Sequence, residues 1–101
     1  MRPDRIRELR KALGFSQEKL AQLLGVSWTT IHRWEKAGAT GPTGTALRTL
    51  NLLQKAVLDP HFQRALGDPR ASDPMFVMHV LLQMFYGGKP NERTVTGGGD
   101  R

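Results

Sequence analysis

Two short amphipathic segments separated by only two residues constrain this 101-residue chain more than any other feature. Ser16 and Ser27 are each suited to cap the N-terminus of a helix, and Gly25 is suited to end the first helix in a left-handed conformation. The first helix is expected to run to Leu24, and the second to span residues 27–36. A link of two residues forces such helices to cross at a steep angle.

This crossing decides which positions must be apolar or small if both helices are to be buried. The sequence meets the requirement throughout, with apolar or small residues at Leu20, Ala21, Leu24, Gly25, Val26, Ile31 and Trp34. In the second helix, Ile31 and Trp34 therefore face inward. Its outward side carries aromatic and polar side chains, namely Trp28, Thr29, His32, Arg33 and Lys36.

The outward side chains match the chemistry of a DNA major groove. An arginine such as Arg33 can donate two hydrogen bonds to guanine, and the Thr29 methyl group or the Trp28 ring can contact the methyl group of thymine. The charge distribution favours the same partner. Residues 1–58 hold ten lysines and arginines against four acidic residues and carry the whole net charge of +6, while residues 59–101 are neutral.

The rest of the sequence predicts further helices and no strand, because glycines, prolines and Asp-Pro pairs separate apolar patterns of helical spacing. The helices are expected at residues 4–13, 43–58, 60–66 and 74–86. The predicted fold is therefore all-α. It comprises a compact five-helix DNA-binding domain at 1–66, a short C-terminal apolar helix within 67–88 and a disordered polar tail at 89–101.

Composition excludes several other classes of protein. Cysteine is absent, which rules out a disulfide framework and suits a reducing cytoplasm. The charged N-terminus predicts no secretory signal, and the longest apolar stretch, at 75–86, is shorter than the roughly 20 residues of a membrane span. The histidines at 32, 61 and 79 lack metal-ligand spacing, and no nucleophile motif or phosphate-binding glycine loop is present. We therefore expect no enzymatic activity, metal or cofactor.

Four runs of residues carry a family resemblance. They are Ile-Arg-Glu-Leu-Arg at 6–10, Gly-Phe-Ser-Gln-Glu-Lys-Leu-Ala at 14–21, Leu-Leu-Gly-Val-Ser at 23–27 and Ile-His-Arg-Trp-Glu at 31–35. Through these runs, residues 5–58 resemble the Cro/repressor-type (XRE-family) helix-turn-helix proteins. The resemblance implies a compact five-helix domain that binds palindromic operators in double-stranded DNA as a homodimer.

The resemblance also implies roles for individual residues. Gln17 would contact a phosphate and steady the end of the second helix, and Arg10 and Glu35 would form a partly buried ion pair between the helix at 4–13 and the second helix. Base edges would be read by Trp28, Thr29 and Arg33. Trp28 is bulkier than the residue usual in the family, which favours contact with a thymine methyl group or a sugar.

Contacts to DNA phosphates are expected from polar groups on and around the two helices. The candidates are Ser16, Gln17, Thr30, His32, Lys36, Thr40 and Thr43. Two of them keep an alternative. His32 can equally be a solvated side chain without a partner, and Thr43 can serve only as the N-cap of the helix at 43–58.

The predicted function is sequence-specific DNA binding by a transcriptional repressor whose helix at 27–36 reads the major groove. The alternative is an antitoxin that binds a toxin protein and regulates its own operon, because residues 41–50 resemble antitoxin-type members of the family. The helix at 74–86 is apolar almost all round. It is expected to form a homodimer interface or, alternatively, to fold back onto the helix at 43–58, and its methionines also suit a toxin-binding surface.

Overall fold

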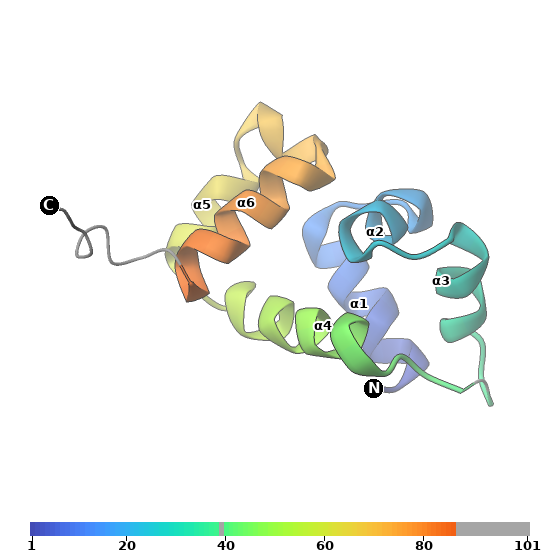
Figure 1. Ribbon diagram of the computed structural model, residues 1–101. Helices are drawn as coiled ribbons and strands as arrows, with labels where there is room; N and C mark the ends of the chain where they lie inside the picture. Colours follow the sequence, from blue (N-terminus) through green and yellow to red (C-terminus); the bar gives the residue numbers. More distant parts are fainter. Residues whose placement is uncertain (39, 87–101) are drawn as a thin grey trace, which may run out of the picture.

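The computed structural model describes residues 1–38 and 40–86, and its regular elements there are all helices. The predicted all-α fold is confirmed. In chain order the elements are α1 (Pro3–Leu13), α2 (Gln17–Leu24), α3 (Trp28–Trp34), α4 (Gly44–Ala56), α5 (Pro60–Leu66), the 3-10 helix η1 (Pro69–Ser72) and α6 (Pro74–Phe85) (Figure 1). The tail predicted at 89–101 lies outside the described residues.

Helices α1 to α4 share one apolar core. Ile6 of α1, Leu20 of α2 and Ile31 of α3 are fully buried, as are Leu50 and Leu53 of α4. Burying each such side chain contributes about 1.5–3 kcal/mol, whereas helices as short as α2 and α3 are not stable in isolation. The core therefore holds both short helices in place. In Figure 1, α3 lies at one edge of the molecule and α5 and α6 lie toward the other.

The caps predicted for α2 and α3 are present. The Ser16 hydroxyl oxygen accepts the backbone N–H of Lys19 at 3.1 Å, and the Ser27 hydroxyl oxygen accepts that of Thr30 at 3.2 Å. Gly25 ends α2 with a φ of +71°, a conformation that strains any residue with a Cβ atom. These local signals fix both ends of α2 and the start of α3.

Three Asp-Pro pairs organise the C-terminal part of the chain. Each aspartate caps the helix that follows it by accepting a backbone N–H at 2.8–2.9 Å, and each proline is the first helical residue. The pairs at Asp59 and Asp73 begin the two helices predicted there, α5 and α6. The pair at Asp68 begins η1, which the sequence alone does not predict. This helix is short because the next Asp-Pro pair follows at once, and a residue before proline disfavours helical dihedral angles.

One face of α6 packs inside the molecule. Val77 and Leu81 are buried, and the helix contacts α2, α4, α5 and η1. The packing of this inner face agrees with the expected alternative, in which the helix folds back onto the helix at 43–58. The outer face and the end of the helix are exposed and mostly apolar, with Met75, Leu82, Phe85 and Tyr86.

A buried carboxylate joins α1, α2 and the end of α3. Glu35 Oε2 accepts a hydrogen bond from Arg10 Nε at 2.7 Å, and Oε1 accepts from Arg10 Nη2 at 3.1 Å and from Gln17 Nε2 at 3.0 Å. The Glu35 side chain is 5% exposed and that of Arg10 is 18% exposed. Arg10 Nη1 also donates to the carbonyl oxygen of Phe15 at 3.1 Å. The structure therefore contains the ion pair that the family resemblance implies, with Gln17 as a further donor.

Helix α3 ends at Trp34, which corrects the expectation that it runs to residue 36. Arg7 Nη1 donates to the Glu35 carbonyl oxygen at 2.8 Å, and this oxygen is one of those that a helix leaves unpaired at its C-terminus. The N–H of Lys36 turns back to the Arg33 carbonyl oxygen at 3.1 Å in a tight turn. Arg7 of α1 therefore contacts the residue that directly follows α3.

The hydrogen bonds around Glu35 also control its ionisation. Burial by itself raises the pKa of Glu35, but the hydrogen bonds from Arg10 and Gln17 and the positive charges of Arg10 and Arg7 outweigh this effect. The pKa of the carboxyl group consequently lies below its ordinary value of 4.5. Glu35 is ionised at neutral pH, and folding favours that ionised form.

Replacing Glu35 by glutamine keeps the shape of the side chain and removes its charge. At pH 7 the free energy of unfolding should fall by about 2 kcal/mol, because Arg10 loses a charged partner in a largely buried site. Since folding lowers the pKa of Glu35, its contribution is complete above pH 4.5 and is lost as the pH falls through the folded-state value. Urea unfolding of both proteins should show a difference at pH 7 that shrinks at a pH well below 4.5.

The matched control is Glu8→Gln. Glu8 pairs with Arg5 at 3.0 Å, but both side chains are more than half exposed, so this change should alter stability by less than about 0.5 kcal/mol. Equal effects of the two substitutions, or a Glu35→Gln effect that is the same at both pH values, would show that the charge of Glu35 does not stabilise the fold.

Candidate nucleic-acid interface

The arrangement of α2 and α3 positions the candidate interface. The two helices pack against each other, and the N–H of Val26 bonds to the Ala21 carbonyl oxygen at 3.0 Å as the chain turns after Gly25. Ala21 is buried beside the turn, where a larger side chain would separate the helices. Packing on α2 leaves α3 at the edge of the molecule with one side uncovered (Figure 1).

The two sides of α3 differ as the sequence predicts. Ile31 and Trp34 are buried in the core, whereas Trp28, Thr29 and Arg33 are exposed. Thr29 and Arg33 are four positions apart and lie on the same side of the helix. The exposed side therefore offers a hydroxyl and methyl group, a guanidinium group and an indole ring within two helical turns.

Trp28 and His32 form a stacked pair on this exposed side. Their ring centroids are 5.3 Å apart and their planes are inclined by 21°. Trp28 remains 48% exposed. The His32 imidazole, which is predicted to contact a phosphate, thus contacts Trp28, a residue predicted to read bases, one helical turn away.

Lys36 lies beyond the end of α3 rather than on its exposed face. The sequence pattern puts it seven positions after Thr29 on one continuous helix, but the helix stops at Trp34. Lys36 is exposed in the turn that follows. Its ammonium group is a point charge on a flexible stem outside the helix, which suits a contact to a phosphate better than one to a base.

Three of the phosphate candidates already have partners within the protein. The Ser16 hydroxyl caps α2, the Thr30 hydroxyl lies 2.9 Å from that of Ser27, and the Gln17 amide donates to Glu35. A hydroxyl group can accept one hydrogen bond and donate another, so Ser16 can still donate to a phosphate. Gln17 has the second N–H of its amide available for the same purpose.

The other two phosphate candidates, Thr40 and Thr43, lie just before the start of α4. Thr43 occupies the N-cap position, but its side chain makes no capping hydrogen bond, and Thr40 is exposed. The first N–H groups of α4 are therefore not satisfied by the cap residue. Thr43 thus holds the N-cap position that the sequence allowed as its alternative role, and its hydroxyl is not committed to the helix.

Arg7 is the residue that sequence reasoning missed. Its guanidinium donates to the backbone carbonyl oxygen of Glu35 at the end of α3. Its positive charge also helps to lower the pKa of the Glu35 carboxyl group. The available signal is its spacing of three residues from Arg10, which puts both arginines on one side of α1. That spacing shows that the two arginines are neighbours, but it does not identify a backbone oxygen 28 residues away as the partner.

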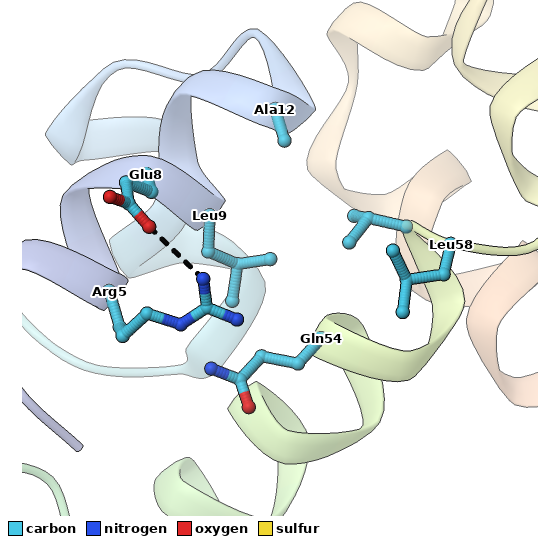
Figure 2. Close-up of a pocket in the computed structure, with 7 residues that line it drawn as sticks. Arg5, Glu8, Leu9, Ala12, Gln54 and Leu58 are labelled. Carbon is cyan, nitrogen blue, oxygen red and sulfur yellow. Dashed lines mark hydrogen bonds and ion pairs between the residues drawn. The ribbon is translucent and has the colours of Figure 1, made fainter.

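A separate cavity of about 240 Å³ lies between α1 and α4 (Figure 2). Leu9 and Ala12 of α1 and Val57 and Leu58 after α4 form its apolar wall, while Arg5, Glu8 and Gln54 supply polar groups. None of these residues belongs to α2 or α3. Within residues 1–38 and 40–86, no group of three or more His, Cys, Asp or Glu side chains is arranged to hold a metal ion. In the same ranges, the structure has no helix that is both long and apolar enough to traverse a bilayer.

The comparisons with known proteins agree with this geometry. A family model described as helix-turn-helix matches residues 6–51. A predicted HTH-type transcriptional regulatory protein of Pyrococcus furiosus is 33% identical over 57 residues, which make up 56% of this chain but only 18% of that protein. No solved structure matches the chain. The matched residues 6–51 include α1, α2 and α3, so this part of the chain is similar to a helix-turn-helix domain.

Proposed function

We propose that this protein is a sequence-specific transcriptional regulator of the cytoplasm that represses genes by occupying an operator in double-stranded DNA. The exposed side of α3 is the observation that carries the proposal. Trp28, Thr29 and Arg33 are exposed there on a helix that the core and the Glu35 contacts hold in place. Guanine, which offers two acceptors, and thymine, which offers a methyl group, are the bases that such side chains read in the major groove.

Electrostatics supports the same proposal. Residues 1–58, which include the whole helix-turn-helix domain, carry the entire positive excess of the chain. Proteins gain most of their non-specific affinity for DNA by releasing counterions from phosphates. In our proposal Gln17, Lys36, Thr40 and Thr43 contact phosphates on either side of the groove and so orient α3.

Selection from a library of random duplexes, read by sequencing, tests the function directly. We expect a short enriched sequence with two-fold symmetry. Affinity for that duplex should fall by about 10³–10⁵ between 50 and 200 mM salt if the protein contacts about 6–10 phosphates. Failure to enrich any sequence, or binding that does not respond to salt, would contradict the proposal.

Arg33 and Lys36 should fail in different ways when each is replaced by alanine. Loss of Arg33 should cost about 1–3 kcal/mol and relax the preference at one base pair in each half-site, because its guanidinium fork reads a base edge. Loss of Lys36 should weaken all sequences alike and reduce the salt slope by about one per site, because it contributes a point charge. Binding measured on every single-base variant of the selected duplex separates the two roles. Uniform weakening by Arg33→Ala would make Arg33 a phosphate contact.

We further propose that the protein binds its operator as a homodimer through the outer face of α6. Leu82, Phe85 and Tyr86 are exposed there. Clusters of large apolar side chains on a surface commonly mark protein interfaces. A second copy is the partner that a two-fold symmetric operator requires, since operator symmetry mirrors that of the protein.

Two neighbouring leucines test the dimer with opposite expectations. Leu82 is 45% exposed, so Leu82→Asp should leave the fold intact, shift the protein from dimer to monomer and weaken operator binding. Leu81 is 1% exposed, so Leu81→Ala should lower the free energy of unfolding by about 2–5 kcal/mol. Sedimentation equilibrium gives the oligomeric state, and urea unfolding gives the stability. A wild-type protein that is monomeric at high concentration would contradict the homodimer.

The antitoxin is the second candidate, and the same outer face of α6 supports it. Met75 adds a flexible, polarisable side chain to that face, as is common on surfaces that bind protein partners. A toxin encoded beside this gene would then cover α6 in place of a second copy. Co-expression of the two genes followed by sedimentation would show a complex of defined stoichiometry, and Leu82→Asp would abolish it.

A further inference from the structure

The Trp28–His32 stack is the feature of the exposed α3 surface that hydrogen-bonded readout does not explain. The two rings are stacked, with centroids 5.3 Å apart and planes inclined by 21°. Among the hydrogen bonds of residues 1–38 and 40–86, none involves the Trp28 indole or the His32 imidazole. Trp28 belongs to the exposed large apolar side chains and not to the core. Its ring therefore presents a broad apolar surface on the side of the helix that carries Thr29 and Arg33.

An apolar ring on a DNA-reading helix has one matching feature in the major groove. The thymine C5-methyl group is the apolar contact among the base edges, which otherwise present hydrogen-bond donors and acceptors. The Trp28 indole has a single donor and no acceptor, so it is poorly suited to bidentate readout. Its large ring surface is well suited to cover a methyl group.

The position of His32 explains how such a contact is kept in place. A half-exposed side chain in the first turn of a helix can occupy several rotamers, and fixing it on binding costs entropy. An aromatic ring one turn further along the helix restricts this freedom before DNA arrives. Offset stacking of two aromatic rings is also favourable in itself.

We propose that Trp28 and His32 act as one stacked unit that recognises the 5-methyl group of thymine. Trp28 makes the contact, and His32 is a positioning residue rather than a phosphate ligand. This inference rests on the proposed function, because it requires α3 to lie in a major groove. It replaces the phosphate contact expected for His32 with an indirect role in base recognition.

Deoxyuridine tests the contact because it differs from thymidine only by the missing methyl group. Each thymidine of the selected duplex is replaced in turn, and binding is measured for the wild-type protein and for Trp28→Ala. One thymidine per half-site should lower wild-type affinity by about fourfold when replaced, which corresponds to one buried methyl group. The Trp28→Ala protein should bind both duplexes equally. An operator without such a thymidine would overturn the inference.

Two substitutions of His32 separate positioning from phosphate binding. His32→Phe keeps a flat ring for stacking and removes the hydrogen-bond donor, whereas His32→Gln keeps a donor and removes the ring. We expect His32→Phe to retain the fourfold discrimination and His32→Gln to lose most of it. The opposite pattern, with His32→Phe weakening every duplex alike and His32→Gln behaving as wild type, would make His32 a phosphate ligand. Urea unfolding of each variant confirms that its fold is unchanged.

Failure of this inference is distinguishable from failure of the proposed function. If selection enriches no sequence, the DNA-binding proposal itself fails. If a sequence is enriched and Arg33→Ala alters its recognition, but no deoxyuridine replacement lowers affinity, only the role of the stacked pair is wrong.

Discussion

The placement of α3 depends on the buried carboxylate of Glu35. A helix of seven residues has little stability of its own, so its orientation comes from the groups that it packs against. Ile31 and Trp34 bury apolar surface in the core, but apolar contacts are not directional. The paired hydrogen bonds between Glu35 and Arg10 have defined geometry and tie the end of α3 to α1. Together the two kinds of contact hold the helix and set its direction.

A buried ion pair such as that of Glu35 and Arg10 fixes the orientation of the helices it joins more readily than it adds net stability. Removing two charges from water is costly, and a well-packed apolar replacement for a buried ion pair is often equally stable. Glu35 also accepts from Gln17, and its backbone oxygen accepts from Arg7, so α1 and α2 both hold the residue after α3. The contacts of Glu35 with α1 and α2 thus help to set the orientation of the exposed side chains of α3. Under the proposed function, the contacts that stabilise the fold would therefore also position the DNA-reading side chains.

Local signals explain which parts of the fold are predictable from the sequence. The serine caps, Gly25 and the Asp-Pro pairs act within four residues, and the helices they delimit are found where expected. The end of α3 is less predictable because its partner, Arg7, is distant in the chain. The inner face of α6 cannot be identified from periodicity, because the helix is apolar on nearly every side. For the site, spacing shows that Trp28 and His32 are neighbours, but only the structure gives the orientation of their rings.

The arrangement of α3 and α6 is compatible with a regulator that dimerises and reads DNA at the same time. Helix α6 lies on the side of the molecule away from α3, with α2 in contact with both (Figure 1). A dimer formed through the outer face of α6 leaves α3 of each copy uncovered. Two recognition helices held apart in this way can enter successive major grooves, which are about 34 Å apart on one side of the duplex. In the proposed dimer, packed contacts of α2 with both helices would connect the interface helix α6 to α3.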